Sequence, residues 1–158
     1  MAFTERLTRN VDMTAWHGKI PVHYRYTLGL AGEKFFTALK KDGKFLATRC
    51  DRCGITYAPP SVYCERCFDA LDTWIELPPT GTLMSFTVVT EDSSGHALKE
   101  PQIIGAVQLD GADTVLIHRI CPHCVDCLCP GARVKAVLLE KKKRAGGIND
   151  IVHFEILE

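Results

Sequence analysis

Hydrophobic positions along the chain follow two periods, one helical and one strand-like. Near the N-terminal end, Phe35 and Leu39 fall on one side at helical spacing. An acidic residue opens this run, two lysines close it, and Gly43 follows as a natural stop. We therefore predict a short helix over residues 33–42. A helix of this length is marginal by itself, so it must pack against another element.

Five later runs alternate apolar and polar residues with the period of two that is typical of half-buried strands. In the first, Met84, Phe86 and Val88 alternate with small polar residues. The predicted strands span residues 82–90, 102–109, 114–120, 132–139 and 150–157. Asp110-Gly111 marks a hairpin turn between the second and the third. Because no long helical pattern intervenes, they predict a small closed barrel, and five is the strand count of the OB-fold.

Four cysteines ahead of the barrel have the spacing of a metal site. They form C-x2-C, ten residues, C-x2-C, and are Cys50, Cys53, Cys64 and Cys67. Each pair can fold into a tight turn that points two thiolates at one place, so the two turns complete a tetrahedral four-sulfur shell. Four protein ligands leave no open position, which indicates a structural zinc. The alternatives are free buried thiols or a rubredoxin-like iron site with the same ligands.

A second cysteine cluster lies between the third and fourth predicted strands. It packs C-x2-C-x2-C-x-C into nine residues, with Cys121, Cys124, Cys127 and Cys129. Thiolates this close repel each other unless a cation or oxidation removes the charge. A second zinc is therefore the leading interpretation, and His123 can replace one ligand. An iron–sulfur cluster fits all but the last spacing, and redox-labile thiols or a loop without metal are the other possibilities.

Composition narrows the class of protein. The chain is 46% hydrophobic and 24% charged, as in soluble globular proteins. Its 19 basic and 19 acidic residues balance to a formal net charge of zero, which disfavours general affinity for nucleic acid. We see neither a signal-peptide run nor the ~20 apolar residues of a membrane span. We expect a cytoplasmic protein without a membrane partner, in which metal explains eight cysteines better than disulfides do.

The chain divides into three predicted parts. Residues 1–32 form an extended arm that contains aromatics and shows no sustained period, and residues 33–77 hold the helix and the zinc ribbon. Pro78-Pro79 marks the boundary to an OB-fold barrel over residues 78–158. The arm either lies against a partner protein or packs on its own domain. The predicted fold is thus mainly β, a short helix and a rubredoxin-like zinc ribbon followed by a five-stranded OB-fold barrel.

This order of elements resembles the zinc-ribbon/OB-fold family of acyl-CoA-associated proteins. The resemblance rests on residues 24–27, 32–36, 48–54, 59–64, 81–83, 85–89 and 109–113. It covers roughly residues 24 to 157. The ribbon and the Ser-Phe-Thr-Val-Val strand at residues 85–89 are its most specific parts.

The resemblance implies a small, non-catalytic subunit that stabilises a separate catalytic chain and helps form its CoA channel. Partners in the family are thiolase-like enzymes, hydroxymethylglutaryl-CoA synthase assemblies and hot-dog-fold enoyl-CoA hydratases. The second cysteine cluster and the long arm depart from the common pattern. They look most like the small subunit of a heteromeric thiolase that cleaves 2-benzoylsuccinyl-CoA. We therefore expect a thiolase partner, with the nucleophile and the acid–base residues in that partner.

Under this resemblance, a basic turn between the last two strands can meet the phosphates of CoA. It consists of Lys141, Lys142, Lys143 and Arg144. The alternative is a solvated hairpin tip. Arg25 and Arg119 are candidates to steer a substrate carboxylate, although such arginines often only cover apolar surface.

A nucleic-acid module is the rival from another class, because OB barrels and zinc ribbons both serve that role. It would need aromatics on an exposed basic face. The barrel strands offer only Phe86 and Phe154, and both are predicted to face the core. A self-sufficient enzyme is disfavoured, since we recognise no Ser/His/Asp set, carboxylate pair or phosphate loop.

Overall fold

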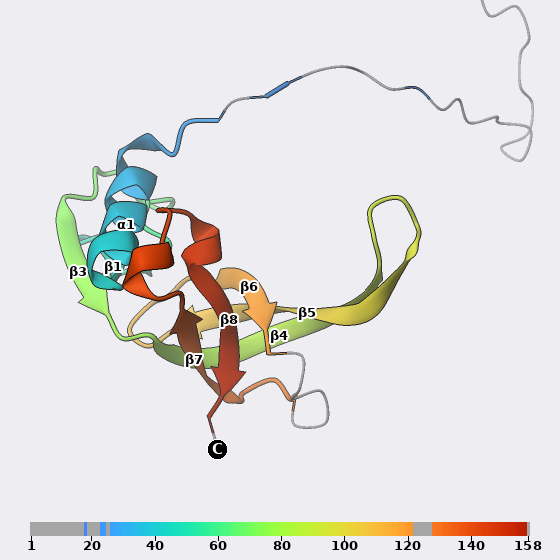
Figure 1. Ribbon diagram of the computed structural model, residues 1–158. Helices are drawn as coiled ribbons and strands as arrows, with labels where there is room; N and C mark the ends of the chain where they lie inside the picture. The colour runs from blue at the N-terminus through green and yellow to red at the C-terminus, as the bar shows by residue number, and fades with distance from the viewer. Residues whose placement is uncertain (1–17, 19–22, 25, 122–127, 158) are drawn as a thin grey trace, which may run out of the picture.

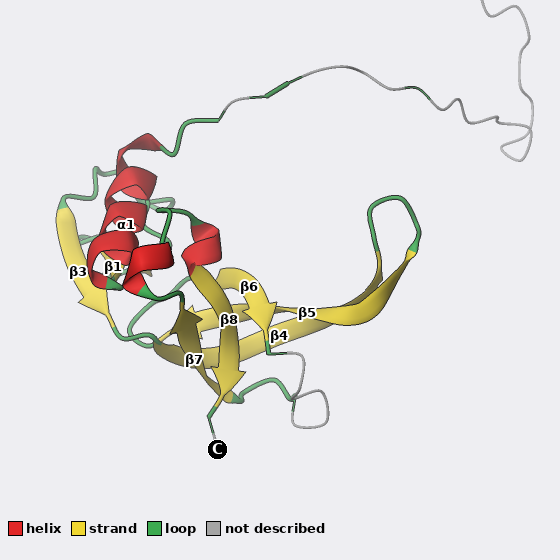
Figure 2. Cartoon of the chain, in the orientation of Figure 1, coloured by secondary structure: helices red, strands yellow, loops and turns green. Residues whose placement is uncertain are grey.

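The computed structural model describes residues 18, 23–24, 26–121 and 128–157 (Figure 1). A helix and a small three-stranded sheet precede a closed barrel, which confirms the predicted mainly β fold (Figure 2). The elements are α1 (Gly29–Asp42), β1 (Phe45–Arg49), β2 (Thr56–Tyr57), β3 (Thr73–Leu77), β4 (Thr80–Glu91), β5 (Ala97–Leu109), β6 (Leu116–Ile120), β7 (Arg133–Leu138), η3 (Lys141–Lys143), η4 (Ile148–Asp150) and β8 (Ile151–Ile156). None of the described helices is both long and apolar enough to cross a bilayer.

Helix α1 begins at Gly29, four residues before the predicted start at Glu33. Burial of Ala31 on the face that also buries Phe35 and Leu39 explains the extra turn. Tertiary packing there outweighs the low helix propensity of glycine. The predicted end is confirmed: Gly43 adopts φ 69°, and its amide donates to the Leu39 carbonyl at 3.0 Å.

The ribbon is built on the three antiparallel strands β2-β1-β3. Central strand β1 pairs Thr48 with Tyr57 on one side and with Trp74 on the other. The ring of Phe45, in β1, lies edge-on to Phe35 of α1, with 6.2 Å between the ring centroids. The helix is therefore attached to the ribbon by aromatic packing. These strands were not predicted, because β2 is two residues long and shows no period.

All five predicted barrel strands are present, and they close in the order β4-β5-β6-β8-β7. Strands β6 and β8 run parallel and pair only at Ile120 and Phe154, whereas the other neighbours are antiparallel. Leu83, Val107 and Val134 are fully buried inside the barrel. They belong to one core cluster that also includes Phe35 and Phe45, so the helix, the ribbon sheet and the barrel share a hydrophobic core.

The predicted core-facing side of β4 is wrong in part. Met84 and Val88 were expected to face the core with Phe86, but they are 48% and 42% exposed. A bulge between Leu83 and Ser85 shifts the alternation by one residue, so Leu83 takes the inner position. Val88 pairs with Ile103, the outermost residue of β5 that also pairs with β6, and beyond this pair β4 and β5 leave the barrel as a long protruding hairpin (Figure 1).

The loop between β5 and β6 is longer than the predicted tight turn. Gly111 adopts φ 88°, as the turn signal requires. The following Asp113 turns toward the ribbon instead of entering β6: its amide donates to the Thr56 carbonyl at 2.9 Å, and its carboxylate accepts the Thr56 amide at 2.8 Å. This loop therefore pairs with the free edge of β2 and ties the ribbon to the barrel.

Candidate functional site

The four ribbon cysteines come together at one point. The Sγ atoms of Cys50, Cys53, Cys64 and Cys67 all lie within 4.8 Å of one another. Cys50 and Cys64 are buried and their partners are half-buried. Four sulfur donors in a closed pocket fit a tetrahedral zinc or iron centre, and the set leaves no ligand position for a substrate.

Two similar turns aim the thiols. In the first, the Gly54 amide donates to the Cys50 carbonyl at 2.7 Å; in the second, the Phe68 amide donates to the Cys64 carbonyl at 2.9 Å. Each turn ends in left-handed backbone, with φ 73° at Gly54 and 60° at Phe68. A phenylalanine in this conformation is uncommon, which indicates that the turn geometry outweighs the local preference of that residue.

A polar group beside Cys64 favours the thiolate form of that cysteine. The Tyr57 hydroxyl accepts the Glu65 amide at 3.1 Å and lies 3.3 Å from the Cys64 sulfur, so its own proton is directed at that sulfur. This hydrogen bond lowers the pKa of Cys64 to about 6 and raises the pKa of Tyr57 to about 12. The Cys53 amide likewise donates to the Cys50 sulfur at 3.3 Å. Such donors stabilise negative charge on metal-binding sulfur.

The second cysteine cluster is only partly described. Cys121 and Cys129 lie at the two ends of the loop that joins β6 to β7, the first half-buried and the second exposed. Cys124, Cys127 and His123 lie outside the described residues. The loop is anchored at both ends: the Cys121 amide donates to the Phe154 carbonyl at 2.8 Å, and the Cys129 carbonyl accepts the Ala132 amide at 3.1 Å. The second zinc stays a prediction.

The basic turn has two parts with different environments. Lys141, Lys142 and Lys143 form η3 and are exposed. The Arg144 guanidinium instead donates to the Leu39 carbonyl in the last turn of α1, at 3.3 Å, and to the Leu139 carbonyl at 2.7 Å. Arg144 therefore fastens the turn to the helix, whereas the three lysine side chains are exposed to solvent.

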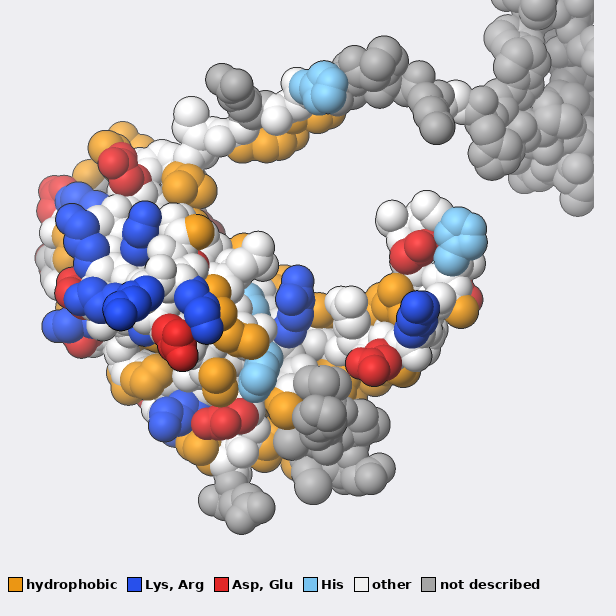
Figure 3. Space-filling model, in the orientation of Figure 1, with side chains coloured by type: hydrophobic (Ala, Val, Ile, Leu, Met, Phe, Trp, Pro, Cys, Tyr) orange, Lys and Arg blue, Asp and Glu red, His pale blue; other side chains and the backbone are white. Residues whose placement is uncertain are grey.

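Two further lysines join this turn in space. Lys40 and Lys41 lie in the last turn of α1 and line a depression of ≈ 380 Å³ together with Phe36, Ala145 and Gly146. Figure 3 shows Lys and Arg side chains gathered over α1 and the neighbouring turn. We call the five side chains of Lys40, Lys41 and Lys141–Lys143 the lysine patch. Sequence analysis missed its helical half because about a hundred residues separate the two segments.

An exposed apolar stripe leads into α1. The side chains of Tyr24, Tyr26, Leu28 and Leu30 are 70%, 86%, 59% and 70% exposed. The two tyrosine rings stack at 6.1 Å between centroids. These four residues occupy every second position of the chain. Sequence analysis missed this alternation, because it treated residues 1–32 as an arm without a sustained period. Leu30 also borders an apolar groove of ≈ 580 Å³ lined by Leu46 and Trp74.

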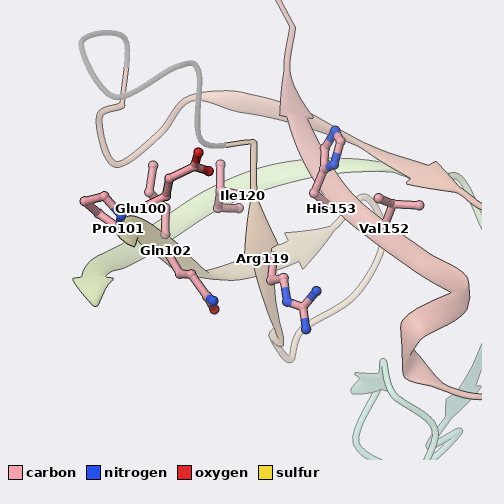
Figure 4. Close-up of a pocket in the computed structure, with 8 residues that line it drawn as sticks. Glu100, Pro101, Gln102, Arg119, Ile120, Val152 and His153 are labelled. Atoms are coloured by element: carbon pink, nitrogen blue, oxygen red, sulfur yellow. The ribbon is translucent and has the colours of Figure 1, made fainter. Parts of the chain in front are cut away.

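The two candidate arginines have different outcomes. Arg25 lies outside the described residues. Arg119 lies on β6 with its side chain exposed, at the edge of a pocket between β5, β6 and β8 (Figure 4). Both are still predictions as carboxylate-steering residues.

Comparison with known proteins identifies both parts of the chain. Residues 37–72 match the family model of the ChsH2 rubredoxin-like zinc ribbon domain, and residues 74–139 match that of the ChsH2 C-terminal OB-fold domain. Together the two matches cover most of the chain from α1 to the end of β7.

Two solved structures share the fold. A DUF35-family protein of unknown function from Sulfolobus solfataricus superposes with a TM-score of 0.58 and 23% identity, over 82% of this chain and 83% of its own. The structure described as "Ltp2-ChsH2(DUF35) aldolase" gives a TM-score of 0.59 and 22% identity, over 84% and 98%. No curated protein matches the chain.

Proposed function

We propose that this chain, which belongs to the ChsH2 family of zinc-ribbon and OB-fold proteins, is a non-catalytic accessory subunit of a cytoplasmic acyl-CoA enzyme. One solved relative is described as an aldolase that combines ChsH2 with Ltp2. In the proposed complex, this chain likewise stands beside a catalytic chain, which it stabilises.

The apolar stripe is the observation that carries this proposal. Tyr24, Tyr26, Leu28 and Leu30 expose large apolar surfaces in consecutive alternate positions. Large apolar side chains that are exposed within one short segment are typical of protein interfaces, where aromatic side chains are enriched. Burying the stripe against a catalytic subunit removes that surface from water.

Zinc in the ribbon is proposed as a structural ion. The thiolates of Cys50, Cys53, Cys64 and Cys67 would hold it, and it would supply cross-linking of the two turns rather than chemistry on a substrate. The Tyr57 hydroxyl would keep the Cys64 sulfur negative and correctly placed. The rigid ribbon then presents α1, with Leu30 in its first turn, in one orientation, because Phe35 and Phe45 join the helix to the ribbon sheet.

The catalytic partner is proposed to be a thiolase that cleaves the carbon–carbon bond of a 3-oxoacyl-CoA. The substrate we favour is 2-benzoylsuccinyl-CoA. The support is sequence resemblance: the second cysteine cluster and the long arm are similar to the small subunit of such an enzyme. The nucleophile and acid–base residues then belong to the partner. A hot-dog-fold enoyl-CoA hydratase or a hydroxymethylglutaryl-CoA synthase assembly is the alternative partner, and the identity of the captured chain separates these cases.

The lysine patch is proposed to lie at the CoA channel. Five ammonium groups from two elements suit the phosphates of CoA. Within the described part of the chain, the ion pair that reaches this patch joins the Glu140 carboxylate to Lys143 Nζ at 3.1 Å. Arg144 contributes by fixing η3 to α1 rather than by touching the phosphates.

The nucleic-acid alternative gains little support. Phe154 is fully buried and Phe86 packs against the core, so neither barrel phenylalanine offers a stacking surface. Steep salt dependence of single-strand binding would nonetheless reveal such a role.

Co-purification tests the proposal. The tagged full chain is expressed with the proteins of its neighbouring reading frames, and the captured chains are identified by mass spectrometry. We expect a catalytic subunit to be retained, and the double variant Y24S/Y26S to lose it. Ile117→Ser is the matched control, since Ile117 is 67% exposed on β6, away from the stripe. Equal capture by Y24S/Y26S and the wild type would contradict the interface.

A further inference from the structure

Three polar side chains form a row across the outer face of the barrel. Arg119 of β6 pairs with Ile104 of β5, which places Gln102 on the same face as a diagonal neighbour. The parallel pairing of Ile120 with Phe154 places His153 beside Arg119 on β8. Since Ile120 and Phe154 point into the core, the residues that precede them point outward.

The row borders a pocket with an apolar floor. The pocket measures ≈ 300 Å³, a size that suits one small molecule. Its apolar lining consists of Pro101, Ile103, Ile120 and Val152. The pocket lies where β6 and β8 share a single pair of residues, so the sheet opens there and exposes the edge of the core.

The donors are not used elsewhere in the part of the chain that the structure describes. None of Gln102, Arg119 and His153 makes a side-chain hydrogen bond there, and no ion pair reaches the Arg119 guanidinium. Figure 4 shows the Arg119 and Gln102 ends extending to one side, whereas the His153 ring and the Glu100 carboxylate extend to the other. The guanidinium of Arg119 and the side-chain amide of Gln102 thus lie on the same side of the sheet, away from the Glu100 carboxylate.

We propose that Arg119 and Gln102 bind an oxyanion, the carboxylate or phosphate of a small acid whose apolar part lies on the pocket floor. A guanidinium offers two parallel donors to such a group, and the amide adds a single donor. The site does not depend on the catalytic partner of the proposed complex. Within that complex, the acyl group and the CoA nucleotide both offer an oxyanion.

Nuclear magnetic resonance titration of the zinc-loaded full chain tests this site. Succinate and inorganic phosphate are added in separate titrations at constant ionic strength. We expect saturable shifts at Arg119 and Gln102, and binding about tenfold weaker in Arg119→Gln because the two-donor contact is lost. Arg119→Lys, which keeps the charge but not the fork, is expected to bind with intermediate affinity. Lys135→Gln is the control, since it removes the same charge from an exposed position on β7, outside this pocket and outside the lysine patch.

The outcomes are distinct. Saturation by succinate alone assigns the site to a carboxylate, by phosphate alone to a phosphate, and by both to oxyanions in general, and each supports the proposal. Linear, non-saturating shifts, or equal affinity in Arg119→Gln and Lys135→Gln, would overturn it. Capture of a catalytic subunit does not bear on these results, so this proposal and the proposed function fail separately.

Discussion

Thr114 holds both backbone polar groups of Ala58. Its hydroxyl accepts the Ala58 amide at 2.7 Å and donates to the Ala58 carbonyl at 2.9 Å. Thr114 belongs to the loop before β6, whereas Ala58 directly follows β2 and is buried. One barrel side chain therefore acts as the strand partner that the edge of the ribbon otherwise lacks, next to the backbone bonds of Asp113.

Replacing Thr114 with valine should loosen this junction. Thr114→Val keeps the shape but leaves two buried backbone groups unpaired, which costs about 1–3 kcal/mol of unfolding free energy. Denaturant unfolding of the zinc-loaded chain measures the change. Thr114→Ser retains the hydroxyl and should stay within about 1 kcal/mol of the wild type. Equal stability of the two variants would show that the ribbon and the barrel do not depend on this contact.

Zinc content should follow the ribbon cysteines. Cys64→Ser removes a buried ligand, so the purified variant should contain at least one zinc fewer per chain than the wild type. Cys129→Ser, which leaves all four ribbon cysteines in place, should keep the ribbon zinc. Elemental analysis after dialysis gives the counts. Full zinc content in Cys64→Ser would rule out the four-sulfur site.

The second cysteine cluster is tested by the same measurement. A wild-type content of two zincs per chain that falls to one in Cys129→Ser would support the predicted second site. One zinc in both proteins would leave that loop without zinc, and iron with sulfide would assign it to a cluster.

The Tyr57 hydroxyl should strengthen metal binding. Tyr57→Phe removes the donor that lies 3.3 Å from the Cys64 sulfur, and loss of such a neighbour weakens metal affinity by about tenfold or more. Competition with a chelator of known affinity at neutral pH measures it. Tyr63→Phe is the control, since the Tyr63 side chain is 61% exposed. Unchanged affinity in Tyr57→Phe would mean that the hydroxyl is not needed by the site.

The ion pair between Asp110 and Arg133 should be visible in the titration of the carboxyl. Two hydrogen bonds of 2.6 Å from Arg133 hold the pKa of Asp110 down at about 2, with help from the Thr80 hydroxyl. Arg133→Gln should move the midpoint up toward the ordinary value of 3.8, which carbon-13 chemical shifts can follow. Lys99→Gln, on the exposed part of β5, should leave it unchanged.

The lowered pKa of Asp110 also determines how the stability of the fold changes with pH. A depressed carboxyl pKa stabilises the fold above pH 3.8, and this contribution is lost as the pH falls through about 2. Both side chains are more than a third exposed, so solvent screening limits the contribution to about 1 kcal/mol. Arg133→Gln should therefore be less stable than the wild type at neutral pH and equally stable near pH 2. A difference that grows toward acid pH would contradict the assignment.

Local patterns made much of the fold predictable. The cysteine spacing places two short turns that need no distant contact to form, so the metal site could be predicted with its four residues. Strand periodicity gave the five barrel strands for the same reason. The face of β4 could not be predicted, because the bulge after Leu83 depends on pairing with β5 and leaves no mark on the apolar pattern.

Contacts between distant segments explain what sequence analysis missed. The guanidinium of Arg144 was grouped with three lysines because it follows them, yet it reaches Leu39, 105 residues away. The extra turn of α1 depends on the burial of Ala31. The row of Gln102, Arg119 and His153 exists only once three strands are in register. In each case the chemistry of the side chain could be predicted from the sequence, but the distant residue that it lies beside could not.

Reconstitution of activity tests the accessory role most directly. The purified chain, its captured catalytic subunit and their mixture are each assayed for CoA-dependent cleavage of 2-benzoylsuccinyl-CoA. The account predicts no turnover by this chain, little by the partner alone, and full activity in the mixture, with loss of activity in Y24S/Y26S. Turnover by the isolated chain, or full activity of the partner without it, would contradict the account.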